Sequence, residues 1–326
     1  MGYTLADYQR VADSDLKRGV VDILRVNSWF MDQLTFEPWD ALSMETYRMK
    51  TLPTVGTRKL NDTFDESKGT TDAVTDKMAL IGGYIDIEKE LLKLRAITDQ
   101  RALQTQMFTK AFALEFNRMS IFGNPLTDDE EFPGLWYRLV NDLPASQTIL
   151  GGGLDVSPDA GAGLAANQLT LLEAVDEAIS ECDMGTCDAL IMNKQMKRRL
   201  RAALKAAGQL DSTKDAYDRK FDTFGAGGPV IVDIGVTNPL DKTSLIIGNV
   251  EADNGNTLTG GDATTIYAVK FGQGEYITGF ELHGLEVDDV GLLEDRVNYR
   301  IHFDWAVGMY LINPFSCTRL VGIVAA

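Results

Sequence analysis

The longest regular pattern of apolar positions runs from Thr98 to Phe122. Apolar residues recur there every three to four positions, as they do on one face of an α-helix. Gly123-Asn124-Pro125 follows and ends the helix. At a rise of about 1.5 Å per residue the helix would span roughly 37 Å. We expect its broad apolar face to pack in the core, and two adjoining rows form that face: Leu103, Met107, Ala111 and Leu114, and Phe108, Phe112, Phe116 and Met119.

Two alternating stretches before this helix, Tyr47 to Pro53 and Met78 to Ile87, predict strands. The segment between them, Asn61 to Asp76, is rich in Asp, Thr, Gly and Ser, as expected of an exposed tip. Together they predict an extended hairpin arm. Because an isolated two-stranded hairpin is marginal in water, such an arm needs another surface to lie on. The acids of the predicted tip are Asp62, Asp65, Glu66, Asp72 and Asp76, and the bases in or near it are Lys50, Arg58, Lys59 and Lys68.

The first forty-five residues combine short helical repeats with many aromatic side chains. Leu16, Val20 and Ile23 follow helical spacing. The apolar residues Trp29, Phe30, Leu34, Phe36 and Trp39 come next, within eleven positions. This much apolar surface needs a cover. Two interpretations stay open: the segment packs on the core of its own chain, or it lies across a neighbouring subunit.

A segment rich in Gly, Ala and Pro, from Gly151 to Ala166, is the best candidate boundary between two regions. Beyond it, helical and strand patterns alternate. The predicted helices contain Leu171 to Cys182 and Asn193 to Ala207, with Asn193 as the cap of the second. The predicted strands are 189–192, 230–234, 244–247, 265–271 and 276–282, and a final sheet region runs from 297 to 323 with a break at Asn313-Pro314.

Composition places the chain among folded soluble proteins. Its 326 residues, 44% apolar and 24% charged, suffice for one large domain or two ordinary ones. No apolar run approaches the ~18 residues of a membrane span, and the start lacks an apolar signal core. The net charge of −17 disfavours a surface built to grip nucleic acid, since Lys and Arg supply that affinity. Cys182, Cys187 and Cys317 form no CxxC pair and are expected to be reduced thiols in a cytosolic product.

The residues that usually carry catalysis are scarce. His302 lies in an alternating stretch and is expected on one face of a sheet, and His283 precedes Gly284 in a predicted turn. The sequence has no HExxH motif, no EF-hand loop and no phosphate-binding GK[ST]. We therefore expect no enzyme, no catalytic residue, no cofactor and no metal site. An acidic α/β enzyme that uses Asp and Glu carboxylates remains the rival from another class.

The helix predicted from Asn193 to Ala207 is strongly basic in an acidic chain. Two interpretations apply: a solvated helix face, or a surface that meets an acidic neighbour. The tip of the hairpin arm, Asp62 to Asp76, is one candidate neighbour among many. Rim charges of this kind mainly set orientation and association rate. The basic residues, with no acid among them, are Lys194, Lys197, Arg198, Arg199, Arg201 and Lys205.

The order of these elements, with three short motifs, resembles the HK97-type major capsid protein of tailed bacteriophages. The motifs are Ile121-Phe122-Gly123-Asn124, Phe132-Pro133-Gly134-Leu135 and the stretch from Asn298 to Gly308. The resemblance implies an α+β, HK97-like capsid fold with an N-terminal arm (1–45) and an extended E-loop hairpin (46–90). It further implies a P domain (91–165) with a spine helix (98–122), and an A domain of mixed sheet with flanking helices (166–283). Returning P-domain and terminal strands would fill residues 284–326.

The same resemblance implies a structural role. Copies would assemble into the hexamers and pentamers of an icosahedral head that encloses double-stranded DNA without sequence-specific binding. The implied partners are a separate scaffolding protein, a portal protein and a decoration protein, with no membrane. The implied location is the virion capsid, assembled in the host cytoplasm. Some family members begin with a long scaffolding region that is cleaved off. This chain starts almost directly with the arm, so it would need a separate scaffolding protein or assemble without one.

An encapsulin-type compartment shell has the same fold and stays as the nearest alternative. No partner Asn or catalytic acid can be nominated for the Lys–Asn cross-links that some family members form. On the resemblance, together with the aromatic and charged patterns above, the candidate inter-subunit contacts are Trp29, Phe30, Trp39, Arg58, Lys59, Asp62, Asp65, Glu66, Asp72, Lys194, Lys197, Arg198 and Arg201.

Overall fold

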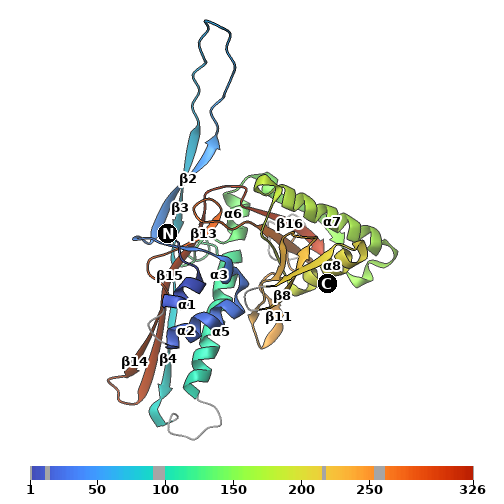
Figure 1. Cartoon of the computed structure of the whole chain (residues 1–326). Helices are drawn as coiled ribbons and strands as arrows, with labels where there is room; N and C mark the ends of the chain where they lie inside the picture. The colour runs from blue at the N-terminus through green and yellow to red at the C-terminus, as the bar shows by residue number, and fades with distance from the viewer. Residues whose placement is uncertain (1, 12–14, 91–99, 215–217, 253–260, 326) are drawn as a thin grey trace.

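The computed structural model describes residues 2–11, 15–90, 100–214, 218–252 and 261–325 (Figure 1). It shows a long hairpin that protrudes from a body built around two β-sheets of five and seven strands. In the described part of the chain, no helix has the length and apolarity that crossing a membrane requires. Short 3₁₀ helices occur at η1 (Ala145–Gln147), η2 (Pro158–Gly163) and η3 (Asp183–Gly185).

The N-terminal segment is helical and packs on the core of its own chain. It forms α1 (Leu5–Val11), α2 (Asp15–Asn27) and α3 (Trp29–Gln33), followed by β1 (Phe36–Pro38), which pairs in parallel with β13 (Ile277–Glu281). Ser28 caps α3 and donates a hydrogen bond to Asn117 of the long helix. Phe30 and Phe36 are fully buried. The interpretation that this segment lies across a neighbour is therefore wrong for Phe30, because its own chain already covers it.

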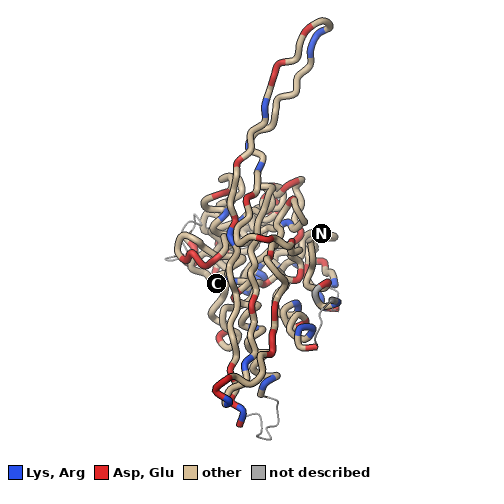
Figure 2. The backbone as a smooth tube through the Cα atoms, turned by 90° about the vertical axis from the view of Figure 1, so that its left-hand side faces the viewer, with Lys and Arg blue, Asp and Glu red and all other residues tan. Residues whose placement is uncertain are grey.

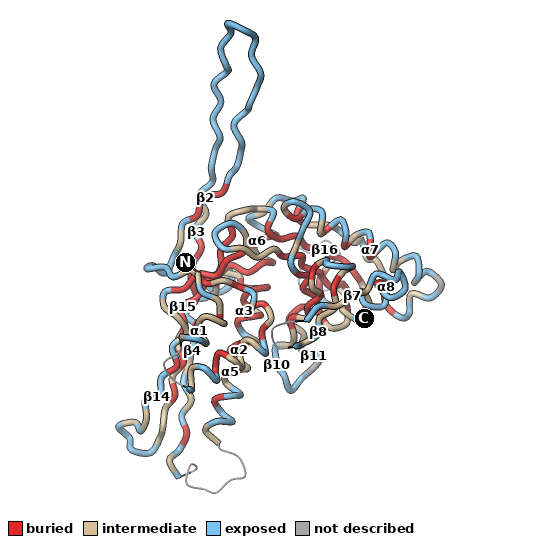
Figure 3. The backbone as a smooth tube through the Cα atoms, in the orientation of Figure 1, coloured by how far each residue is buried: buried red, intermediate tan, exposed pale blue. Residues whose placement is uncertain are grey.

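The protruding arm consists of β2 (Ser43–Thr51) and β3 (Thr70–Lys77), paired antiparallel from Ser43 with Lys77 to Thr51 with Thr70. The second strand of the hairpin was expected at 78–87, and that expectation is wrong. The residues 79–88 form β4 (Ala79–Glu88), which pairs with β15 (Asn298–Leu311). Part of the polar stretch that was expected to form the tip, Asn61 to Asp76, belongs to β3, the second strand of the arm. All residues from 51 to 70 are exposed (Figure 3).

The predicted long helix is confirmed as α5 (Gln100–Phe122); Thr98 and Asp99 lie outside the described residues. It packs against the five-stranded sheet, in which β15 lies between β4, β13 and β14 (Glu286–Leu292). Phe112 and Phe116 stack on the buried Trp305 of β15, with ring centroids 6.1 and 5.7 Å apart. Only one of the two predicted rows enters the core, because the sheet contacts one side of the helix; Leu103 and Met107 are exposed.

Two of the motifs behind the resemblance meet at the end of α5. Gly134, which precedes α6 (Leu135–Asn141), donates its backbone N–H to the carbonyl of Gly123 over 2.8 Å. A Cβ atom on Gly134 would lie 2.6 Å from the nitrogen of Gly123 and from the oxygen of Met119. Only glycine fits between these backbones.

The seven-stranded sheet has the order β5-β16-β12-β6-β9-β8-β7. One face is covered by α7 (Leu164–Ser180) and α8 (Lys194–Ala207), the two helices that the sequence predicts. A separate hairpin joins β10 (Val236–Asn238) to β11 (Asp241–Leu245). The strands of the large sheet are β5 (Thr148–Asp155), β6 (Ala189–Met192), β7 (Leu210–Lys214), β8 (Lys220–Phe224), β9 (Val230–Asp233), β12 (Ala263–Val269) and β16 (Cys317–Val324).

Two sequence expectations fail in this sheet, and one of its elements was not predicted. Gly151 to Gly153 lie within β5, paired with β16, so the segment from Gly151 to Ala166 is not a free linker. The last strand, β16, was expected to return to the peripheral sheet with β15, but it pairs with β5 and β12. The β7–β8 hairpin was not predicted. Each error concerns strand pairing, which depends on residues far away along the chain.

Candidate subunit interface

The root of the arm is held by buried charges. We call Thr46, Arg48, Val74 and Asp76 the arm root and residues 52–69 the arm tip. Asp76 and Arg138 of α6 form an ion pair of 2.8 Å in which both side chains are at most 1% exposed. Arg138 also donates to the carbonyls of Met309 (2.6 Å) and Pro133 (3.2 Å). The expectation that Asp76 is exposed with the other acids of the tip is wrong, because α6 covers it.

Arg48 is the second buried cation of the arm root. Its Nε atom donates to the carbonyl of Leu311 over 3.1 Å, and burial lowers the pKa of its guanidinium. Burial also raises the pKa of the nearby Asp142 carboxyl, although Arg138 and Arg48 partly offset this rise. Both arginines therefore bond to main-chain oxygens of the strand–turn segment that ends β15. This network fixes the direction in which the arm leaves the body.

The arm tip is exposed along its whole length. Its apolar side chains are among the most exposed of the described residues: Leu52 at 76%, Val55 at 93%, Leu60 at 91% and Phe64 at 66%. Burying such side chains stabilises by roughly 1.5–3 kcal/mol each, so their exposure in an extended hairpin is unfavourable in an isolated chain. The sequence analysis missed these four residues, because it nominated only charged residues within the arm. The signal was present as single apolar residues within a polar stretch.

The charged candidates of the arm are all exposed: Arg58, Lys59, Asp62, Asp65, Glu66 and Asp72. Figure 2 shows that both signs of charge occur along the arm. The pairs made within the chain are few and exposed. Lys50 contacts Asp72 over 3.0 Å, and the guanidinium of Arg58 lies over the ring of Phe64 at 5.1 Å. Exposed pairs of this kind contribute about 0–1 kcal/mol.

The aromatic and basic candidates lie elsewhere on the body. Trp29 is half-buried against Phe271, and Trp39 is exposed beside the base of the arm. In α8, Lys194 and Lys197 are half-buried, whereas Arg198 and Arg201 are exposed. The structure therefore places the charged candidates on two separate surfaces, one along the arm and one on the seven-stranded sheet domain, whereas Trp29 and Phe30 in α3 belong to neither.

Metal-ligating side chains do not cluster among the described residues. No three His, Cys, Asp or Glu side chains there are arranged to hold a metal ion. His302 lies on the β4–β15–β14 sheet, opposite Tyr84 and Asp288, and His283 lies in the loop before β14. A buried carboxyl occurs at Glu251, where burial raises the pKa to about 7 and the charge of Arg319 partly offsets this rise.

Comparison with known proteins adds an independent observation. Residues 13–160 match the family model of the major capsid protein GP7. No curated protein sequence matches the chain. This fold is shared by many solved structures.

Three of these structures show how far the likeness extends. The holo-SrpI encapsulin complex of Synechococcus elongatus is 11% identical, with a TM-score of 0.57 over 91% of this chain and 88% of that one. Mycobacterium phage Bobi is 11% identical, with a TM-score of 0.55 over 91% and 90%. The capsid of the empty GTA particle is 14% identical, with a TM-score of 0.54 over 90% of both chains. At these identities the likeness concerns the fold.

Proposed function

We propose that the chain is a major capsid protein of phage heads. Residues 13–160 match the major capsid protein GP7 family, and the HK97-type capsid fold extends along nearly the whole chain. Its role is structural and its place is the virion. In this proposal, copies assemble into hexamers and pentamers of an icosahedral head, within the host cytoplasm, and each arm lies on a neighbouring copy.

The arm tip carries this proposal. Residues 52–69 are exposed along their full length and present Leu52, Val55, Leu60 and Phe64 to solvent. The buried arm root meanwhile holds the arm in one direction, away from the body. A rigidly directed hairpin with an uncovered apolar tip has the form of an element that binds outside its own chain.

The net charge of the chain bears on how the shell would hold DNA. With a net charge of −17, the chain lacks the excess of Lys and Arg that gives tight phosphate binding. We propose that the shell encloses double-stranded DNA without sequence-specific contacts, so that packaged DNA can slide along its inner surface. A portal protein, a scaffolding protein and a decoration protein are the further partners in this proposal, with no membrane.

Removal of the arm tip tests the assembly proposal. Thr51 and Thr70 are paired residues, so an Asn-Gly turn can replace residues 52–69 and close the hairpin. We expect the shortened chain to fold with little loss of thermal stability, because all the replaced residues are exposed. We expect it to form no particles by negative-stain electron microscopy, under conditions in which the full chain does.

A milder variant serves as the control for length. Leu60→Ser with Phe64→Ser keeps the arm but removes apolar area, and it should lower the yield of particles without abolishing folding. Normal particles from the shortened chain would contradict the proposal. The encapsulin-type alternative predicts particles that hold a cargo protein and no DNA, so nuclease protection of encapsidated DNA separates the two functions.

A further inference from the structure

Two helices of opposite charge lie side by side on one face of the seven-stranded sheet. The buried sides of α7 and α8 share one core, in which Leu171 and Val175 of the first join Leu200 and Leu204 of the second. Figure 1 shows both helices on the outer edge of the domain, far from the arm. Their outward sides have no cover among the described residues, and they differ in charge.

The outward side of α7 is acidic. The chain has no Lys or Arg from residue 139 to residue 193, a stretch that includes all of α7. Glu173, Asp176 and Glu177 are exposed, and no base among the described residues pairs with them. The exposed carboxylates of α7 thus face solvent as a row of uncompensated negative charge.

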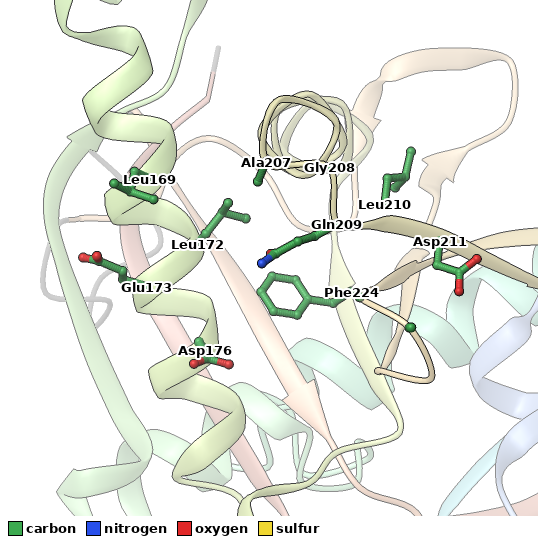
Figure 4. Close-up of a pocket in the computed structure, with 12 residues that line it drawn as sticks. Leu169, Leu172, Glu173, Asp176, Ala207, Gly208, Gln209, Leu210, Asp211 and Phe224 are labelled. Atoms are coloured by element: carbon green, nitrogen blue, oxygen red, sulfur yellow. The ribbon is translucent and has the colours of Figure 1, made fainter.

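A groove of about 820 Å³ runs beside this row, between α7 and the segments that follow α8 and β8 (Figure 4). Glu173 and Asp176 lie on the α7 side, and Asp211 of β7 lies on the other. Its apolar lining comes from Leu169, Leu172, Leu210 and Phe224. The groove therefore combines acidic edges with an apolar floor, a combination that suits a long cationic side chain with an aliphatic stem.

The outward side of α8 is basic, and only part of it is used within the chain. Arg201 pairs with Asp222 over 3.3 Å, and Arg199 donates to the carbonyl of Ala325. Arg198 and Lys205 are exposed and form no ion pair with any described residue. They are seven residues apart, so they point to the same side of the helix about 10 Å from each other. Ala202 between them is small enough for close approach.

We propose that α8 of one copy docks in the groove beside α7 of a second copy, with Arg198 and Lys205 against Glu173, Asp176 and Asp211. The inference rests on the proposed self-assembly, and it selects this groove over the arm tip as the acidic partner of α8. The two surfaces are different patches on the same domain, so the contact is head-to-tail and repeats from copy to copy. Contacts of this type close into rings when the rotation permits.

The test uses full-length chains with reversed charges. The groove variant is Glu173→Lys with Asp176→Lys, and the helix variant is Arg198→Glu with Lys205→Glu. Each variant places like charges at the proposed contact, so each should assemble at least about tenfold more slowly than wild type in light scattering at low salt. A chain that carries all four changes restores opposite charges and wild-type net charge, and should regain the wild-type rate to within about threefold.

Two further measurements complete the experiment. The control Asp128→Lys with Glu130→Lys makes the same change in net charge as the groove variant, but on the exposed loop after α5. It should leave the assembly rate unchanged. A 1:1 mixture of the groove and helix variants should assemble faster than either one alone. If the four-change chain stays as slow as the two-change chains, or the two-change chains assemble normally, the pairing of α7 with α8 is wrong. Wild-type chains that never form particles would instead refute the proposed function.

Discussion

Asp72 and Asp76 lie four residues apart on the same face of β3, and each meets a cation. Asp76 and its partner Arg138 are at most 1% exposed, whereas Asp72 and its partner Lys50 are about 60% exposed. The strand, the face and the charges are alike. What differs is that α6 and β15 cover the first pair, whereas the second pair is largely exposed. The comparison distinguishes the buried pair, which anchors the arm to the body, from the exposed pair, which is accessible to another molecule.

The largest effect should come from breaking the buried pair. Arg138→Met leaves the carboxylate of Asp76 buried without its ion-pair partner, and we expect the free energy of unfolding to fall by about 3–5 kcal/mol. The matched change Lys50→Met removes the cation of the exposed pair and should cost less than about 1 kcal/mol. Urea denaturation of the unassembled chain measures both. Equal losses for the two variants would show that burial does not distinguish the pairs.

A second comparison uses one glycine in the packed body, Gly134, and one in the exposed arm tip, Gly56. Gly134→Ala forces a methyl group against the backbones of Gly123 and Met119, and should cost about 1–3 kcal/mol. In the arm tip, a Cβ on Gly56 would meet no atom within 4 Å. Gly56→Ala should therefore leave stability within about 0.5 kcal/mol of wild type. Thermal melts of both variants check this, and a costly Gly56→Ala would mean that the tip is packed after all.

The smallest effect concerns pH. Burial raises the pKa of the Asp142 carboxyl above its ordinary value of 3.8. The folded chain therefore holds this proton more tightly than the unfolded chain. The resulting stability is fully present below about pH 3.8 and is lost as pH rises through the folded pKa. Asp142→Asn should remove this loss, so the variant gains stability relative to wild type between acidic and neutral pH.

Asp241 gives the opposite sign and serves as the control for this prediction. It is exposed, and hydrogen bonds from Ser244 and Thr243 lower the pKa of its carboxyl to about 2. Its contribution is present above about pH 3.8 and is lost as pH falls through about 2. Asp241→Asn should therefore be less stable than wild type above about pH 3.8, and this difference should disappear as pH falls through about 2. The same pH profile for both variants would contradict the assignment of burial as the cause at Asp142.

Local patterns allowed part of this molecule to be predicted. The helices α5 and α8 follow from apolar spacing together with a stop at Gly123 and a cap at Asn193, all of which are local along the chain. The capping side chain of Asn193 accepts the N–H of Met196 over 2.7 Å, as its position suggested. The fold class was also predicted, because the order of elements resembles a known capsid fold.

The arm root and the strand pairs could not be predicted, because their partners are distant in sequence. Asp76 resembles the other acids of a polar stretch until Arg138 meets it. Apolar and polar residues alternate in segment 79–88 as they do in β3. Pairing with β15, more than 200 residues later, keeps segment 79–88 in the body, whereas β3 pairs with β2 in the arm. Charged residues were nominated for the interface because their pattern is visible. The exposure of Leu60 and Phe64 follows only from the three-dimensional structure, in which the arm protrudes from the body.

The bonds of Arg48 and Arg138 to the carbonyl oxygens of Leu311 and Met309 have a mechanical consequence. A neighbour that pulls on the arm pulls, through these guanidinium groups, on the main chain of β15. That strand shares ladders with β4, β13 and β14. A pulling force on the arm in the assembled shell would then be distributed over the whole five-stranded sheet instead of acting on one side chain.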